Sequence, residues 1–312
     1  MDRKTGALLG ALTADAAAMG LHWLYDQRRI EEVAGAAPEF RAPNAADFTG
    51  PEGKPLGYFA HGGKRAGEPS HYGAQMLAMA TSLARAGAYD AEDYARAFRE
   101  AFGAGGGWTG YIDRPTRAVL VSMDGAAEGA PLSACGADDA QLPALSKLPP
   151  LLVRHHGEAA LPGMVESAVR VTNDRDDAAE WGAAFAAMLA AAIEGAAPAD
   201  CAAAARGISA RIDAQAEAAL ARRGETPEAV AADFGLHCQL EVAFPVILQM
   251  LATAADFASA AQANIRAGGD SCGRAIPLGA ILGASFAGDG ARGVPAGWLS
   301  RVSVPGALAA LF

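Results

Sequence analysis

Apolar residues recur at helical spacing along most of the 312-residue chain. Leu8, Leu9, Leu12 and Ala16 share one face of a helix that we place from about Thr5 to Gly20. Alanine is abundant, β-branched residues are sparse, and no pair of alternating segments predicts strands. The pattern therefore predicts an all-α protein. The same spacing predicts further helices over 71–86, 91–102, 114–126, 158–171, 175–194, 198–222, 236–254, 257–267 and 272–286.

Three stretches interrupt this pattern. Residues 36–69 are rich in glycine and proline, residues 103–107 are almost all glycine, and residues 129–150 are irregular. A loop as long as 36–69 is more often functional than idle in a compact domain. No repeat of fixed period is present, so we expect one domain over residues 1–312.

Composition narrows the class of protein. With 52% hydrophobic and 19% charged residues, the chain is not of the disordered type. The net charge of −10 and the absence of a Lys/Arg run argue against a nucleic-acid or anionic-membrane partner. Four cysteines lack the spacing of a zinc ribbon or a disulfide scaffold, and no apolar run suits a membrane span. We expect a soluble cytoplasmic protein with reduced thiols; the pattern makes no prediction of oligomeric state.

The segment before the last long helix carries the first candidate chemistry. Gly268 and Gly269 allow a tight turn, while Asp270 and Ser271 are suited to cap the helix that follows. The start of that helix would offer free N–H groups to an anion. The alternative is a glycine turn with an ordinary N-cap, and spacing alone does not separate the two interpretations.

Two further segments carry polar residues in apolar surroundings. Asp15 stands in an alanine-rich helix, where it either meets a cation, a donor or a ligand hydroxyl, or faces solvent. Ser70 is typical of an N-cap, and it places His71 and Tyr72 in the first turn of the next helix. Trp108, after the glycine run, is either an aromatic wall for a flat ligand or part of the core.

In this order the motifs resemble the ADP-ribosylglycohydrolase-like family, which includes the J1-crystallins. Residues 10–20 are similar to the family's opening Gly-Asp-Ala helix, and residues 70–79 lie where it has Thr-Asp-Asp-Thr. Residues 171–174 sit where Thr-His often occurs. Residues 268–273 look like the closing Gly-Gly-Asp-x-Asp-Thr motif. The resemblance spans nearly the whole chain, and the closing motif is its most specific part.

The resemblance implies an orthogonal all-α bundle with one cleft. In hydrolytic relatives, two magnesium ions held by hydroxyl and carboxylate groups of the two loops bind ADP-ribose. They assist the attack of water on the anomeric carbon of an ADP-ribosylated side chain. A small molecule or an ADP-ribosylated substrate is the partner it implies. The substrate-binding residues are then Asp15, Ser70, Tyr72, Gly268, Gly269, Ser271 and Trp108.

The chain departs from the family pattern at the ligand positions. His71 and Tyr72 replace two carboxylates, and Gly73 replaces a threonine. Cys272 replaces the second carboxylate of the closing motif, with Gly273 in place of a hydroxyl residue. One remaining carboxylate cannot balance two magnesium ions, which argues against a binuclear magnesium site.

The residues at the replaced positions suggest two other kinds of chemistry. Asp270, Cys272 and His71 are a ligand set for a single zinc ion with an open position for water. Alternatively, Cys272 is a nucleophile whose thiol pKa is lowered by a helix N-terminus and by Arg274, with His71 as its base. The plain alternative is a small buried cysteine packed at a glycine turn.

Two functional classes follow. One is a hydrolase of an ADP-ribosyl or related N- or O-glycosidic bond with a non-standard metal site, whose catalytic residues are Asp270, Cys272 and His71. The other is a catalytically silent member that binds ADP-ribose or a nucleotide, or that serves structurally as the crystallin relatives do. Fold alone does not choose between them, because function resides in the site.

Overall fold

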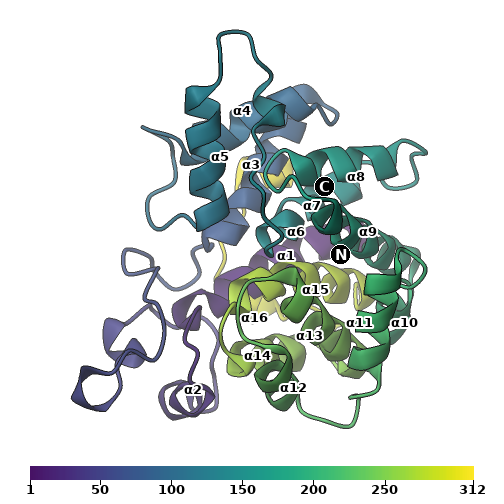
Figure 1. Cartoon of the computed structure of the whole chain (residues 1–312). Helices are drawn as coiled ribbons and strands as arrows, with labels where there is room; N and C mark the ends of the chain where they lie inside the picture. Colours follow the sequence, from purple (N-terminus) through teal and green to yellow (C-terminus); the bar gives the residue numbers. More distant parts are fainter.

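The computed structural model describes all of residues 1–312 and is built from helices without a β-sheet, as the sequence predicted (Figure 1). Only four isolated bridges of β type occur. The helices are α1 (Arg3–Ala18), α2 (Gln27–Ala34), α3 (His71–Ala86), α4 (Ala91–Phe102), α5 (Arg114–Gly125), α6 (Pro143–Ser146), α7 (Leu148–Arg154), α8 (Leu161–Arg170), α9 (Asp176–Glu194), α10 (Pro198–Ala203), α11 (Ala210–Leu220), α12 (Pro227–Phe234), α13 (Leu240–Thr253), α14 (Phe257–Ala267), α15 (Ser271–Ser285), α16 (Ala296–Leu299) and α17 (Gly306–Ala309).

Helices α1 and α15 lie against each other in the middle of the molecule (Figure 1). Glycines of both helices permit this contact, because a Cβ atom on Gly10 would lie 2.3 Å from the Gly279 carbonyl oxygen. A Cβ atom on Gly283 would lie 2.1 Å from the carbonyl oxygen of Gly6. Backbone therefore packs on backbone, with the two helices antiparallel. This crossing sets the end of α1, with Asp15, beside the start of α15.

The other helices surround this pair and form one apolar core of 79 buried residues. Helices α3, α4 and α5 lie together at the top of the view, and α8 to α11 lie at its right (Figure 1). The segment 36–69, predicted to be irregular, winds outward at the lower left of the view, and its only helical segments are short 3-10 turns (Figure 1). No helix has both the length and the apolar character needed to cross a lipid bilayer.

Three predicted helices, at 71–86, 91–102 and 257–267, have the bounds that the structure shows. The prediction of one helix over 198–222 is wrong, because Gly207 has a φ of +85° and Ser209 caps a separate helix, α11. Helices α2 and α12 were not predicted. The short helix α6 lies inside the segment 129–150 interpreted as irregular, and α7 begins in that segment and continues to Arg154. Prolines occupy first-turn positions of both helices, where helices accept them.

Candidate functional site

Asp15 lies at the junction of α1 and α3 and is fully buried. The Ser70 amide donates to Asp15 Oδ2 over 2.8 Å, and the Ser70 hydroxyl donates to Asp15 Oδ1 over 2.5 Å. Burial raises the pKa of Asp15 to about 7, although these donors oppose the shift. Asp15 thus meets donors of its own chain and holds Ser70, the N-cap residue of α3, in place; the solvent-facing alternative is wrong.

Ser70 caps α3 as predicted, since its hydroxyl oxygen accepts a hydrogen bond from the Tyr72 amide over 3.0 Å. Position 73 is a glycine because there is no room for a side chain beside Asp15. A Cβ atom at that position would lie 2.2 Å from Asp15 Oδ2. The loss of a hydroxyl residue at position 73 is therefore tied to the close approach of the Asp15 carboxylate.

Tyr72 and Asp270 join the two loops. The Tyr72 hydroxyl donates to Asp270 Oδ2 over 2.6 Å, and both side chains are buried. Asp270 also caps α15, because its Oδ1 accepts from the Gly273 amide over 3.0 Å. Burial raises the pKa of Asp270 to about 6, and the Tyr72 hydrogen bond opposes that shift. Asp270 therefore holds the start of α15 and joins it to the first turn of α3.

The glycine turn before α15 has the tight geometry that the sequence predicted. Gly268 and Gly269 have φ angles of +77° and +62°, and a Cβ atom on Gly269 would lie 2.0 Å from the Leu236 carbonyl oxygen. The predicted free N–H groups are absent, however. The Ser271 amide donates to Gly269 O over 2.8 Å, and the Cys272 amide donates to His22 Nδ1 over 3.2 Å. The start of α15 is thus a capped turn and not an open anion site.

Cys272 does not have the environment of an activated thiol. Its side chain is fully buried, and the thiol donates to the Asp15 carbonyl oxygen over 3.6 Å. Burial, with the nearby Asp15 and Asp270 carboxylates, raises the pKa of Cys272 well above its ordinary value. Arg274 does not offset this, because its guanidinium donates to Asn264 Oδ1 over 2.9 Å and to the Gly268 carbonyl. The prediction of a lowered thiol pKa is wrong.

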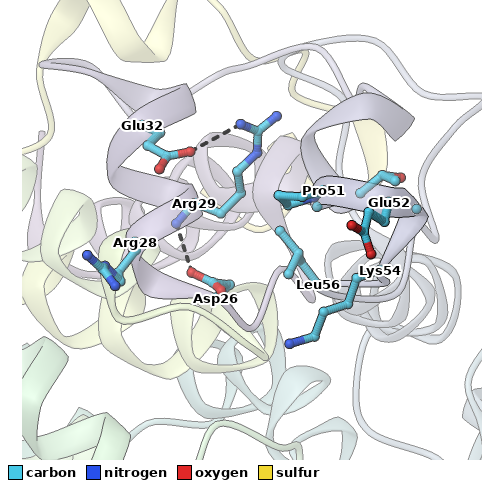
Figure 2. Close-up of a pocket in the computed structure, with 11 residues that line it drawn as sticks. Asp26, Arg28, Arg29, Glu32, Pro51, Glu52, Lys54 and Leu56 are labelled. Carbon is cyan, nitrogen blue, oxygen red and sulfur yellow. Dashed lines mark hydrogen bonds and ion pairs between the residues drawn. The ribbon is translucent and has the colours of Figure 1, made fainter.

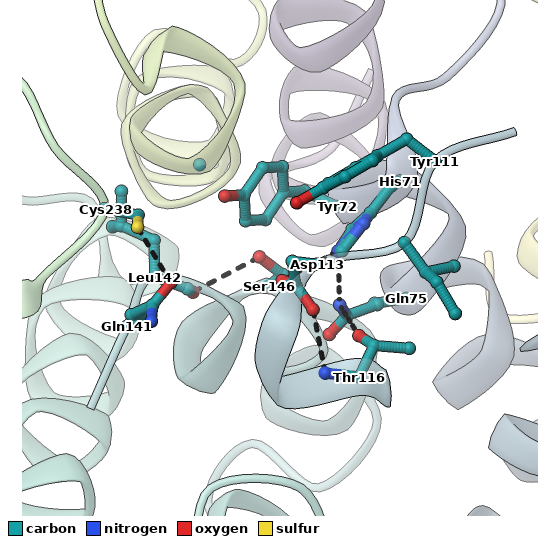
Figure 3. A network of polar contacts seen from close by, with 12 residues as sticks. His71, Tyr72, Gln75, Tyr111, Asp113, Thr116, Gln141, Leu142, Ser146 and Cys238 are labelled. Carbon is teal, nitrogen blue, oxygen red and sulfur yellow. Dashed lines mark hydrogen bonds and ion pairs between the residues drawn. The ribbon is translucent and has the colours of Figure 1, made fainter. Parts of the chain in front are cut away.

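His71 pairs with a residue that the sequence analysis gave no role. Its Nε2 lies 2.9 Å from Asp113 Oδ2 and 2.9 Å from Gln75 Nε2. Asp113 caps α5 by accepting from the Thr116 amide over 2.8 Å (Figure 3). Burial lowers the pKa of His71 and raises the pKa of Asp113 to about 6. The signal was present in the sequence, because Asp113 precedes Arg-Pro at the start of a predicted helix.

The structure does not assemble the predicted zinc ligands. His71 turns toward Asp113, Cys272 toward the Asp15 carbonyl, and Asp270 toward Tyr72. No group of three or more His, Cys, Asp or Glu side chains is arranged to hold a metal ion. The set of Asp270, His71 and Cys272 is corrected accordingly.

The residues present also do not fit the two magnesium ions that the family resemblance implies. Magnesium takes about six oxygen ligands, mostly from carboxylates and water. Here the carboxylate oxygens of Asp15 and Asp270 already accept from protein donors. Tyr72 and Cys272 occupy positions where the family pattern has carboxylates. No chemical step is derived through magnesium for this chain.

Three aromatic side chains pack together beside the site, where Tyr111 stacks on His71 with ring centroids 6.5 Å apart. Trp23 packs on Tyr111 with ring centroids 5.1 Å apart and on Tyr58 at 5.8 Å. Tyr58 and Tyr111 are 5.3 Å apart, and Tyr58 is 53% exposed. We call this set of Trp23, Tyr58 and Tyr111 the aromatic cover. Trp108 is not part of it, because Trp108 packs on Phe102 with its Nε1 donating to the Tyr111 carbonyl.

A buried polar network extends from the site toward α9. Lys147 is fully buried and donates to Asn173 Oδ1 over 3.1 Å and to the Thr172 hydroxyl. Asn173 in turn donates to Asp139 Oδ1 over 3.2 Å. Burial lowers the pKa of Lys147 to about 7, although Asp113 and Asp139 oppose the shift. Sequence reasoning singled out residues 171–174 but missed the lysine, which stands in the segment interpreted as irregular.

The most spacious cavity described lies elsewhere. It measures about 1060 Å³ between α2 and residues 49–56, and its walls are mostly charged or polar (Figure 2). Arg29 in its wall forms an ion pair with Glu32, with 3.2 Å between Arg29 Nη1 and Glu32 Oε2. None of the predicted site residues lines this cavity. His71, Tyr72, Asp270 and Cys272 are all at most 2% exposed, so the site is closed.

The chain is thus an all-α protein whose candidate site lies between its first and last long helices. At that site the start of α3 is joined to the start of α15. The chain matches the ADP-ribosylglycohydrolase family model over residues 1–311 and belongs to that family.

Crystallin J1A of Tripedalia cystophora is 26% identical over 318 aligned positions, which cover 97% of this chain and 92% of the crystallin. Crystallin J1B of the same animal is 24% identical and covers 96% of this chain and 92% of the crystallin. A solved structure described as an ADP-ribosylglycohydrolase-related protein complex shares the fold, with a TM-score of 0.65 and 22% identity. That match covers 99% of this chain and 95% of the other.

Proposed function

We propose that this chain is a non-hydrolytic member of the ADP-ribosylglycohydrolase family, one that does not carry out magnesium-dependent cleavage of ADP-ribosyl bonds. One observation carries the proposal: the two carboxylates that remain beside the starts of α3 and α15, Asp15 in α1 and Asp270, are already bonded by donors of the chain itself. Asp15 accepts from Ser70, and Asp270 accepts from Tyr72. A magnesium ion would have to displace these donors and would still lack carboxylate ligands.

Two further points support a role without turnover. The site is closed in the structure, since Asp270 and Tyr72 are at most 1% exposed. Two relatives that align over nearly the whole chain bear the name crystallin. Both points favour the silent alternative over a re-engineered metal hydrolase.

The test is the release of free ADP-ribose from proteins ADP-ribosylated on side chains, measured by chromatography with magnesium and with EDTA. We expect no release above the protein-free control in either condition. Asp270→Asn is the matched variant and should behave as the wild type. Magnesium-dependent release that disappears in Asp270→Asn would overturn the proposal.

A second candidate is a metal-independent hydrolase, and the pairing of His71 with Asp113 favours it. A buried histidine whose Nε2 lies 2.9 Å from a buried carboxylate oxygen has the composition and distance of a general acid–base pair. Burial also brings the pKa of Asp270 to about 6, near the range in which a carboxyl group exchanges protons at neutral pH. Release that persists in EDTA and is lost in Asp113→Asn would select this candidate.

A further inference from the structure

Trp23 of the aromatic cover and two histidines beside it carry buried polar atoms that nothing in the protein bonds. His22, Trp23 and His61 are 1%, 7% and 5% exposed. His22 Nε2, Trp23 Nε1 and both ring nitrogens of His61 have no hydrogen-bond partner. The rings are in contact, with centroids 4.4 Å apart for His22 and Trp23 and 5.2 Å apart for His22 and His61. Buried polar atoms are nearly always bonded, so four unmatched atoms in one place require an explanation.

Most of these atoms are donors. His22 Nδ1 accepts from the Cys272 amide over 3.2 Å, so in the neutral ring the hydrogen is on Nε2. Burial and the neighbouring His61 hold the pKa of His22 well below its ordinary value, which keeps that ring neutral. Trp23 Nε1 is a donor only, and a neutral His61 adds one more N–H group. The cluster therefore presents three donors and a single acceptor.

The carboxylates nearby face other groups. Asp270 accepts from Tyr72 and from the Gly273 amide, and its Oδ1 lies 3.6 Å from His22 Nδ1, the ring nitrogen that carries no hydrogen. Asp113 Oδ1 accepts from the Thr116 amide, and Asp113 Oδ2 has no hydrogen-bond partner but lies 2.9 Å from His71 Nε2. A water molecule accepts two hydrogen bonds but brings two hydrogens of its own, for which only one His61 nitrogen remains. An occupant that only accepts hydrogen bonds matches the cluster better.

We propose that His22, Trp23 and His61 form an inner binding site for a small oxyanion, of the phosphate or carboxylate class. The three N–H groups bind its oxygens in a site from which water is largely excluded, where such bonds are strong. Side-chain N–H groups bind the anion at this site. The backbone amides at the start of α15 do not, because they already donate hydrogen bonds within the protein. The inference goes beyond the proposed function, because binding of an oxyanion requires neither hydrolysis nor magnesium.

The backbone of Trp23 supports the same assignment. Its φ of +64° is uncommon for a bulky residue. Two hydrogen bonds hold it: the Trp23 amide donates to Gly269 O over 2.8 Å, and the Tyr58 amide donates to Trp23 O over 2.9 Å. Residues held in such conformations gather at binding sites. Tyr58 belongs to the long segment 36–69 and is 53% exposed, so the Trp23 backbone is held close to the protein surface.

The test uses the four tryptophan indole N–H signals in a ¹H–¹⁵N NMR spectrum of the full chain. Inorganic phosphate and sodium formate are titrated separately at constant ionic strength, with sodium chloride as the reference. We expect a saturable shift of the Trp23 signal at about 10 mM or below, and no shift of Trp298. Saturation by phosphate alone or by formate alone identifies the class of anion.

Three variants test which residues form the binding site. His61→Phe removes two unbonded nitrogens but keeps a ring, so it should fold and abolish the shift. Trp298→Phe is the matched control and should leave the affinity unchanged. Trp23→Phe, followed through histidine ring nitrogens, should weaken binding about tenfold. Absence of a saturable shift with either anion, or unchanged affinity in His61→Phe, would overturn the proposal. Neither result bears on the ADP-ribose release assay.

Discussion

Asp15 and Asp270 have similar tasks, since each carboxylate accepts a hydrogen bond at the start of a helix: Asp15 from the N-cap residue Ser70, and Asp270 from the Gly273 amide. Asp15 serves α3 from a different helix, and Asp270 serves α15 from its own N-cap position. Negative charge at a helix N-terminus is stabilising, so both acids have a structural use without a metal. The acids that remain at the site are those that hold the helices in place.

Gly73→Ala tests the tie between Asp15 and α3. The added Cβ atom would lie 2.2 Å from Asp15 Oδ2 and 2.8 Å from Pro69 Cβ, so the variant should lose about 1–3 kcal/mol of unfolding free energy. Urea denaturation measures the loss. Gly63→Ala is the control, because no atom lies within 4 Å of its added Cβ. Equal stability of the two variants would contradict the packing described.

A pH-dependent prediction follows from His61. Burial lowers the pKa of His61 from 6.5 to about 3, so between these values the unfolded chain binds a proton that the folded chain does not. The wild type therefore loses about 1.4 kcal/mol per pH unit from this residue as the pH falls. His61→Phe should gain stability relative to the wild type by that slope between about pH 6 and pH 4.

Urea denaturation at three pH values in that range measures this slope. The same substitution at the less buried His156 controls for the change of residue type. A stability difference between His61→Phe and the wild type that does not change with pH would show that His61 is not held neutral by burial.

At the residue scale, local features were predictable and distant pairs were not. The Ser70 cap and the glycine turn at Gly268 depend on neighbours within a few positions, and the sequence predicts both. The Tyr72–Asp270 hydrogen bond joins residues 198 positions apart, and no local pattern reveals it. The predicted zinc set was wrong for the same reason, because each side chain found another partner across the fold.

At the scale of the elements, glycines decide where the site forms. Gly6 and Gly10 on α1 face Gly283 and Gly279 on α15 at four-residue spacing, which sets both helix axes close together. This spacing is visible in the sequence and indicates close helix packing. The break between α10 and α11 depends on a positive φ at Gly207, which an alanine-rich pattern does not reveal.

Gly283→Ala tests the helix contact. Its Cβ atom would lie 2.1 Å from the Gly6 carbonyl oxygen, which belongs to backbone and cannot rotate away. We expect a loss of about 3 kcal/mol or more of unfolding free energy, measured by urea or thermal denaturation. Gly163→Ala in α8 meets no atom within 4 Å and should be neutral or stabilising by up to about 1 kcal/mol. A neutral Gly283→Ala would contradict the crossing.

At the scale of the whole molecule, an acidic protein has few free acids at its centre. The net charge of −10 comes from 35 acidic residues, while Asp15, Asp113 and Asp270 in the site are each bonded by the chain. All-α architecture and family were predictable from the order of motifs along the chain. The closure of the site was not, because it depends on contacts between distant segments, such as that of Tyr72 with Asp270.

Isothermal titration calorimetry of magnesium into the full chain measures whether the site with Asp15 and Asp270 binds magnesium. We expect only the heat of dilution up to about 10 mM magnesium, in the wild type and in Asp270→Asn alike. Saturable binding of magnesium in the wild type, lost in Asp270→Asn, would show that this site does hold the ion.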